Sequence, residues 1–112
     1  MKIEDLDNYC LKVTEKYMRN YYSANAQLIK NETTEYEIVK GLEIPTSVSP
    51  IKITNFFSTG DDIYGIYVEY LNENIEYETA EVNFETPITI KLVTGNSDVS
   101  RTSICTLELV EK

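Results

Sequence analysis

The sequence predicts an α+β fold, in which one long N-terminal helix packs on an antiparallel sheet of five or six strands. Apolar residues recur every three or four positions over residues 4–28, which is the period of a helix, and apolar and polar residues alternate from residue 34 onward, which is the period of a strand. A chain of 112 residues is long enough for one hydrophobic core. We therefore expect a single domain, 1–112, with its helix at about 4–28 and its sheet at about 34–110.

One apolar stripe defines the expected helix, residues 4–28. Its members are Ile3, Leu6, Cys10, Val13, Tyr17, Tyr21, Ala24 and Leu28. On the helix surface, Glu15 and Arg19 have the spacing of a favourable i,i+4 ion pair. An alternative ends the helix near Tyr22 and begins a short strand at 27–30. In either case the stripe has to be buried against the sheet.

Alternation of period two places the strands that follow. Expected strands at 34–38 and 51–57 flank the loop "PTSVSP", and a last hairpin joins "ITIKLVT" to "RTSICTLELV" through "GNSD". Short connections predict antiparallel neighbours, since parallel strands need long crossovers. In outline, one helix on such a sheet resembles the cystatin-like architecture; the resemblance is topological and includes no sequence motif.

The stretch 61–85 is expected to form the central hairpin. A three-residue loop, Asn72-Glu73-Asn74, would place Leu71 opposite Ile75, with an asparagine in the left-handed conformation. A two-residue loop would instead place Glu69 opposite Glu78, and like charges directly opposite each other destabilise a strand pair. In the preferred register one face of the hairpin belongs to the core, namely Tyr64, Ile66, Val68, Tyr70, Ala80, Val82 and Phe84.

The charge of the chain is concentrated in the same stretch. The net charge is −9, and between Lys52 and Lys91 there are eight acidic residues and no basic one. Such a surface disfavours nucleic acid, whose affinity comes largely from Lys and Arg, and anionic membranes. The expected partner is a basic protein surface, with no direct nucleic acid and no membrane.

Tyrosines lie among these carboxylates. Tyrosine is enriched at protein interfaces, where it offers a large contact area at low entropy cost. The predicted partner-binding residues are Tyr67, Glu69, Tyr70, Glu73, Glu76, Tyr77 and Glu78. The alternative interpretation is an ordinary strand pair whose solvated side is acidic.

The chain does not contain the residues that several kinds of catalytic and metal sites need. The chain has no histidine, which removes His-dependent nucleophilic and metal sites, and its four glycines form no phosphate-binding loop. We therefore expect no catalytic residues, no metal, no cofactor and no enzymatic activity. Without an apolar leader or a spanning segment a cytoplasmic location is expected, with Cys10 and Cys105 reduced and structural.

These observations favour a non-enzymatic acidic protein-binding module. Its expected role is that of an inhibitor, immunity or anti-defence type protein, which covers a basic surface of its partner, including one whose normal ligand is nucleic acid, as a mimic of nucleic acid would. One alternative is a structural or assembly subunit of phage type, with a homo-oligomer possible. Another is a small-ligand module with a pocket between helix and sheet, lined by Tyr17, Tyr21 and Tyr36.

Overall fold

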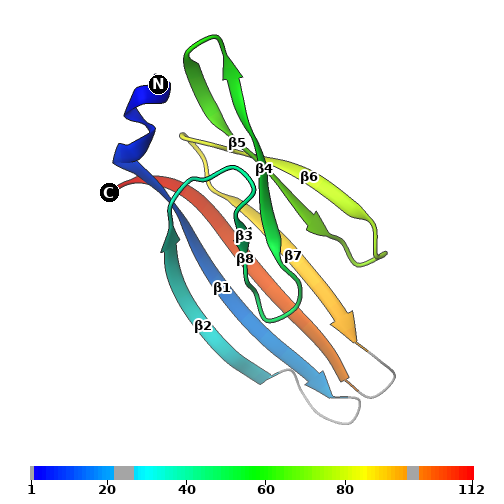
Figure 1. The fold of residues 1–112 in the computed structure, drawn as a ribbon. Helices are drawn as coiled ribbons and strands as arrows, with labels where there is room; N and C mark the ends of the chain where they lie inside the picture. Colours follow the sequence, from blue (N-terminus) through cyan, green and yellow to red (C-terminus); the bar gives the residue numbers. More distant parts are fainter. Residues whose placement is uncertain (1, 22–26, 96–98) are drawn as a thin grey trace.

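The structure is a sandwich of two antiparallel sheets with four strands each (Figure 1). The computed structural model describes residues 2–21, 27–95 and 99–112. One short 3-10 helix precedes the strands, and the described residues form no longer helix. The expected α+β fold with a long N-terminal helix is therefore wrong, and so is the cystatin-like outline, because both need a helix where residues 9–21 form a strand.

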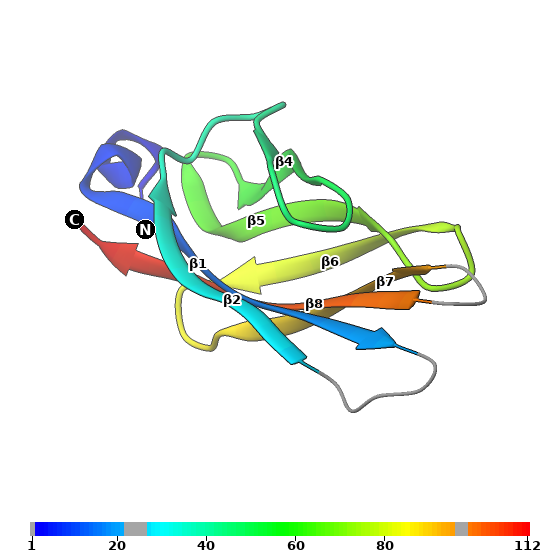
Figure 2. The ribbon, with the colours of Figure 1, turned by 90° about the horizontal axis from the view of Figure 1, so that it is seen from below.

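Eight strands follow one another along the chain. Their bounds are η1 Ile3–Asn8, β1 Tyr9–Tyr21, β2 Gln27–Tyr36, β3 Glu43–Ile44, β4 Ile51–Thr59, β5 Asp62–Leu71, β6 Tyr77–Asn83, β7 Ile88–Gly95 and β8 Val99–Glu111. The terminal sheet has the order β2-β1-β8-β7, and the middle sheet has the order β3-β4-β5-β6. The chain thus meanders from neighbour to neighbour and changes sheet twice, after β2 and after β6. In Figure 2 the middle sheet lies above the terminal sheet.

The segment expected as a helix contains a central strand, β1. It pairs with β2 on one side and with β8 on the other, and the pairing with β8 covers all 13 of its residues. Leu11, Val13 and Tyr17 are buried in alternation with Lys12 and Lys16. The alternative start of a strand at Gln27 agrees with the structure, since β2 begins there.

The physical reason for this correction is non-local pairing. The spacing of the apolar residues in 4–28 fits a helical stripe, but that stripe omits Leu11, which is 0% exposed. It includes Leu28, which is 57% exposed. Strand β8 supplies hydrogen bonds along the whole of β1, and it comes from the opposite end of the chain. Tertiary pairing of this kind overrides local helix propensity.

The hydrophobic core lies between the two sheets. Both sheets contribute to it, with buried residues from β1, β7 and β8 facing those from β3 to β6. Its fully buried aliphatic members include Leu11, Ile44, Ile51, Ile53, Ile66, Val68, Val82, Leu92 and Leu107. The expected strand at 51–57, the loop 45–50 and the last hairpin are confirmed by β4, by the β3–β4 connection and by β7 and β8.

The β5–β6 hairpin differs from the expected register by two residues. Leu71 lies opposite Tyr77, and Tyr67 lies opposite Glu81, so the connection has five residues, 72–76. A shift of two residues leaves every side chain on its expected face, since side chains alternate with period two. Ile66, Val68 and Val82 are therefore buried as expected.

Tyr64 is an exception to this agreement. It was expected in the core, but its side chain is 48% exposed. The pairing of β4 with β5 is irregular here, since Phe57 lies opposite Gly65 and Ser58 opposite Ile63. Such a bulge turns a side chain to the other face of its sheet. Ile63 is buried in its place.

Candidate functional site: an acidic face and an aromatic cleft

The two sheets divide the charge of the molecule unequally. The middle sheet and its connections, residues 43–86, contain nine of the 19 carboxylates but only one of the ten basic residues, Lys52. Residues 43–86 therefore carry −8 of the net charge of −9. The terminal sheet and its connections are almost neutral. A basic partner would be attracted to the half of the sandwich that the middle sheet forms.

The face of the middle sheet that points away from the core combines rings with carboxylates. The Phe57 ring stacks on the Tyr67 ring with 5.6 Å between centroids, and it lies 5.5 Å from the Tyr64 ring. Across the strands, Tyr67 lies opposite Glu81. Glu69 lies between Lys52 of β4 and Thr79 of β6. This surface can contact both the aliphatic and the charged parts of a basic side chain.

The connection between β5 and β6, residues 72–76, is held in shape by Asn72. Its Oδ1 atom accepts hydrogen bonds from the backbone N–H groups of Asn74 and Glu76, at 2.9 and 3.0 Å. Its own N–H donates to the carbonyl of Glu76 at 2.8 Å. We call residues 72–77 the hairpin tip. Hydrogen bonds between its own residues hold its backbone.

The hairpin tip exposes two large side chains. Ile75 is 80% exposed and Tyr77 is 73% exposed, next to the carboxylates of Glu73 and Glu76. Ile75 also has φ +60°, a left-handed conformation that is uncommon for a β-branched residue. The expectation of an asparagine in that conformation is wrong. Asn72 is instead used as a hydrogen-bonding side chain.

The predicted partner-binding residues lie on both sides of the hairpin. Those on the outward face or in the tip are Tyr67, Glu69, Glu73, Glu76 and Tyr77. Tyr70 packs against the core from the other face and donates a 2.7 Å hydrogen bond to Glu78. This bond raises the pKa of Tyr70 and lowers the pKa of Glu78. The structure thus brings five of the seven together and separates Tyr70 and Glu78, which bind each other.

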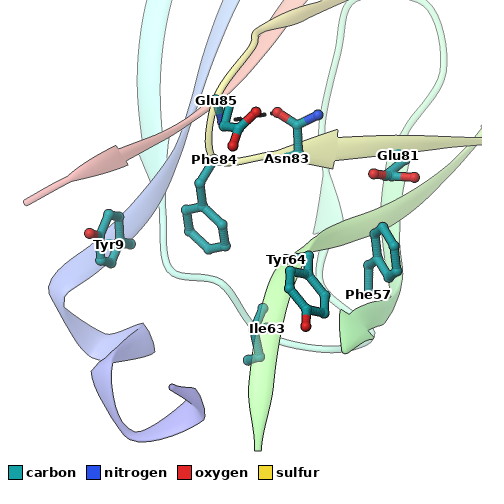
Figure 3. A pocket seen from close by; sticks show the side chains of 8 residues that line it. All are labelled: Tyr9, Phe57, Ile63, Tyr64, Glu81, Asn83, Phe84 and Glu85. Carbon is teal, nitrogen blue, oxygen red and sulfur yellow. Dashed lines mark hydrogen bonds between the residues drawn. The ribbon is translucent and has the colours of Figure 1, made fainter. Parts of the chain in front are cut away.

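An aromatic cleft lies at the opposite end of β6 from the tip (Figure 3). It has a volume of about 440 Å³. Its lining comes from the start of β1, from β4, β5 and β6, and from the residues that follow β6. The lining residues are Tyr9, Phe57, Ile63, Tyr64, Glu81, Asn83, Phe84 and Glu85. Sequence reasoning missed this cleft, because Tyr9 was assigned to a helix and Phe84 to the core.

Local contacts hold the walls of the aromatic cleft. The Tyr9 and Phe84 rings meet edge to face, with centroids 5.1 Å apart. Asn83 Oδ1 accepts hydrogen bonds from the N–H groups of Glu85 and Thr86, at 2.9 and 2.8 Å, which fixes the turn after β6. Gly65 allows β5 and β6 to approach here, since a Cβ atom at this position would lie 2.2 Å from the carbonyl oxygen of Val82.

The N-terminal segment borders the same region. Beyond the end of β6, Lys2 forms an isolated bridge with Asp62, and the Ile3 N–H donates to the Asp61 carbonyl at 2.8 Å. The Lys2 ammonium also forms an ion pair with Asp62 at 3.0 Å. The pairing of β6 with β5 ends at Gly65, and the N-terminal segment covers part of β5 near Asp62, beyond that point.

A buried carboxylate, Glu15, lies between the sheets. It accepts hydrogen bonds from the Ser103 hydroxyl at 2.6 Å and from the Ser47 N–H at 2.8 Å, and Lys30 Nζ lies 3.4 Å away. Burial raises its pKa, but the two hydrogen bonds and the Lys30 charge outweigh burial, so the pKa of Glu15 is lowered. The expected pair with Arg19 is not what holds Glu15; Arg19 donates to the Tyr17 hydroxyl. We interpret Glu15 as a structural link between β1, β8 and the β3–β4 loop.

The small-ligand pocket expected beside a helix does not form as described. Tyr36 lies opposite Leu11, whereas Tyr17 lies opposite Lys30, six positions further along β1. At about 3.4 Å per residue the two tyrosines are roughly 20 Å apart. Tyr21 lies still further along the strand. With no helix over the sheet, this proposed pocket is wrong.

The cysteines show no sign of reactivity. Both thiols are free and buried. Cys10 lies opposite Val110 and Cys105 lies opposite Glu15, so the two are too far apart along β1 and β8 for a disulfide between them. That they are reduced stays a prediction. Burial raises the pKa of Cys105 to about 12 and also raises the pKa of Cys10. Over residues 2–21, 27–95 and 99–112, no three His, Cys, Asp or Glu side chains are grouped to hold a metal ion. No helix in these ranges is long and apolar enough to cross a membrane.

The fold and the surface together define an all-β sandwich with one acidic, aromatic face. No protein-family model matches the chain, and no curated protein or solved structure matches it. The hairpin tip, the outward face of the middle sheet and the aromatic cleft are therefore the candidate sites of function.

Proposed function

We propose that the chain is a non-enzymatic acidic binding module that occupies a basic surface of another protein. The binding element is the tip and outward face of the β5–β6 hairpin. The observation that carries this proposal is the exposure of Ile75 and Tyr77, at 80% and 73%, on an ordered tip surrounded by carboxylates. Large exposed apolar side chains within a charged rim are typical of interaction surfaces.

The division of charge supports the nature of the partner. Carboxylates on one half of the sandwich would attract and orient a basic surface from a distance, which raises the association rate. The desolvated Tyr77 and Ile75 would then slow dissociation. A protein of this kind acts by covering its partner's surface, as an inhibitor, an immunity protein or an anti-defence protein does. When that surface normally binds nucleic acid, the carboxylates take the place of phosphates. Two free buried thiols favour action in a reducing cytoplasm.

The first test is capture of a partner from host lysate, followed by measurement of its binding kinetics. Replacing Glu69, Glu73 and Glu76 with Gln should slow association several-fold at low salt and reduce the dependence of the rate on salt. The matched control replaces Glu32, Glu35 and Glu37, which lie on or next to the edge strand β2, and changes the net charge equally. Equal effects of both triple variants would show that only total charge matters and would contradict a hairpin interface.

A second candidate function is assembly with further copies of the chain. Edge strand β2 favours it, because it is ten residues long, pairs on one side only and is exposed on most of its length. Leu28 and Ile29 are 57% and 49% exposed there. Exposed edge strands offer unpaired N–H and C=O groups to another chain. Size-exclusion light scattering measures the mass in solution. A mass that rises with protein concentration in the unchanged protein, together with a monomeric mass in Ile29→Lys, would support assembly through β2.

A further inference from the structure

The aromatic cleft has the size and the lining of a binding site, and it lies at the other end of β6 from the hairpin tip, although it shares Phe57, Tyr64 and Glu81 with the outward face of the middle sheet. Its volume of about 440 Å³ lies within the roughly 300–1,000 Å³ of small-ligand sites. Its walls are rings from two directions, the Tyr9–Phe84 pair and the Tyr64 ring beside Phe57. Figure 3 shows these rings around a common opening, with Ile63 at its base. The cleft is therefore a concave, mainly apolar cavity.

The polar groups of the cleft set the charge of its ligand. Its lining contains two carboxylates, Glu81 and Glu85, and no basic residue. Among the ion pairs formed by the described parts of the chain, none includes either carboxylate. Asn83 cannot neutralise them, because its side chain is uncharged; its Oδ1 atom accepts the two backbone hydrogen bonds of the turn. The positive charge that would complement this cavity has to come from a ligand.

We propose that the aromatic cleft binds the guanidinium group of an arginine side chain presented by a protein partner. A guanidinium group is planar, stacks on aromatic faces and donates several hydrogen bonds to carboxylates, so it can use the rings and the rim together. A compact ammonium group would form less directional hydrogen bonds with the carboxylates of Glu81 and Glu85, and it would cover less of the aromatic rings. The site lies at the other end of β6 from the tip, and a free arginine derivative can probe it. Failure here and failure of the hairpin interface are therefore distinguishable.

The test is an NMR titration of the labelled protein with N-acetylarginine amide. We expect saturable shifts in the ring and amide signals of Tyr9, Tyr64 and Phe84, and no such shifts with the citrulline analogue, which has nearly the same shape without the charge. Tetramethylammonium is the third probe, and weaker binding than that of the arginine derivative is expected. Equal responses to the arginine and citrulline derivatives, or tighter binding of tetramethylammonium, would overturn the assignment.

Matched variants locate the site. Tyr64→Leu should lower the affinity for the arginine derivative by about two- to fivefold, the range of an exposed cation–π contact. The control Tyr77→Leu, at the hairpin tip, should leave it unchanged. Likewise, Glu81→Gln with Glu85→Gln should weaken binding, whereas Glu73→Gln with Glu76→Gln should not. If the tip variants weaken binding as much as the cleft variants do, the cleft is not the guanidinium site.

Discussion

At the scale of single residues, Glu15 shows how a buried charge is made compatible with a core. The residue Glu15 is only 6% exposed, and Ser103, Ser47 and Lys30 all contact its carboxylate. A buried charge without such partners would be strongly destabilising. With them, the side chain ties the β3–β4 loop to the terminal sheet.

This arrangement predicts an acid-sensitive contribution to stability. The folded-state pKa of Glu15 is lowered, so the contribution is present above the pKa of the unfolded chain and is lost as the pH falls through the folded value. Urea unfolding should therefore show a loss of stability below about pH 4. Glu15→Gln should cost about 1–3 kcal/mol at pH 7 and flatten this part of the profile. The exposed Glu4→Gln, on η1 and outside the Glu15–Lys30 network, is the control. An unchanged profile in Glu15→Gln would mean that other carboxylates cause the acid sensitivity.

Ile75 leads to a second prediction at this scale. A β-branched residue at φ +60° is strained, while asparagine tolerates this conformation. Ile75→Asn should therefore raise the free energy of unfolding by about 1 kcal/mol. If Ile75 contacts a partner, the same substitution should speed dissociation of the complex. A variant that is stabilised and binds with an unchanged dissociation rate would remove Ile75 from the interface.

At the scale of elements, the approach of β5 to β6 depends on one glycine. A Cβ atom on Gly65 would meet the Val82 carbonyl at 2.2 Å and the Asn83 Cα at 2.9 Å, both of them backbone atoms that cannot turn aside. Gly65 lies opposite Asn83, the last residue of β6. The spacing of these two strands also sets the width of the aromatic cleft.

We predict that Gly65→Ala destabilises the protein by about 2 kcal/mol or more, because β6 has to move. Gly41→Ala is the control, since no atom lies within 4 Å of its Cβ position and only the strain of φ +90° remains. That strain costs about 1–2 kcal/mol. Urea unfolding gives the two free energies, and amide exchange shows whether protection is lost in β6. A smaller cost at Gly65 than at Gly41 would contradict the close approach.

At the scale of the whole molecule, the charge is placed on one layer of a thin sandwich. The principal extents are 53 × 27 × 20 Å, and residues 43–86, the middle sheet and its connections, carry −8 of the net charge of −9. The mutual repulsion of their carboxylates opposes folding, and salt screens it with a Debye length of about 10 Å at 0.1 M. The few ion pairs of the described residues are mostly exposed and contribute little.

The melting temperature should therefore rise when sodium chloride is increased from about 0.01 to 0.15 M. Neutralising Glu69, Glu73 and Glu76 with Gln should reduce this rise more than neutralising Glu32, Glu35 and Glu37 does. Differential scanning calorimetry at both salt concentrations measures the effect. A melting temperature that falls with salt would mean that attractive pairs dominate the electrostatics of the fold.

Much of the chain from β4 onward could be predicted from the sequence, because local features determine it. Alternation placed β4, β7 and β8, and it identified the buried face of β5 and β6 even though the register was wrong by two residues. The concentration of charge in residues 61–85 is a property of composition and needs no fold. The outward placement of Tyr67 and Tyr77 followed from the same alternation, whereas that of Tyr64 did not.

The tertiary structure alone decided the N-terminal half and the sites. Residues 9–21 carry apolar spacings compatible with a helix and with a strand, and pairing with β8 at the far end of the chain selects the strand. The aromatic cleft joins Tyr9 to Tyr64 and Phe84, which no local pattern connects. The exposure of Tyr64 depends on a bulge between β4 and β5. In each case the deciding contacts lie between residues distant in sequence, and their free energy exceeds the small differences in local propensity on which sequence patterns depend.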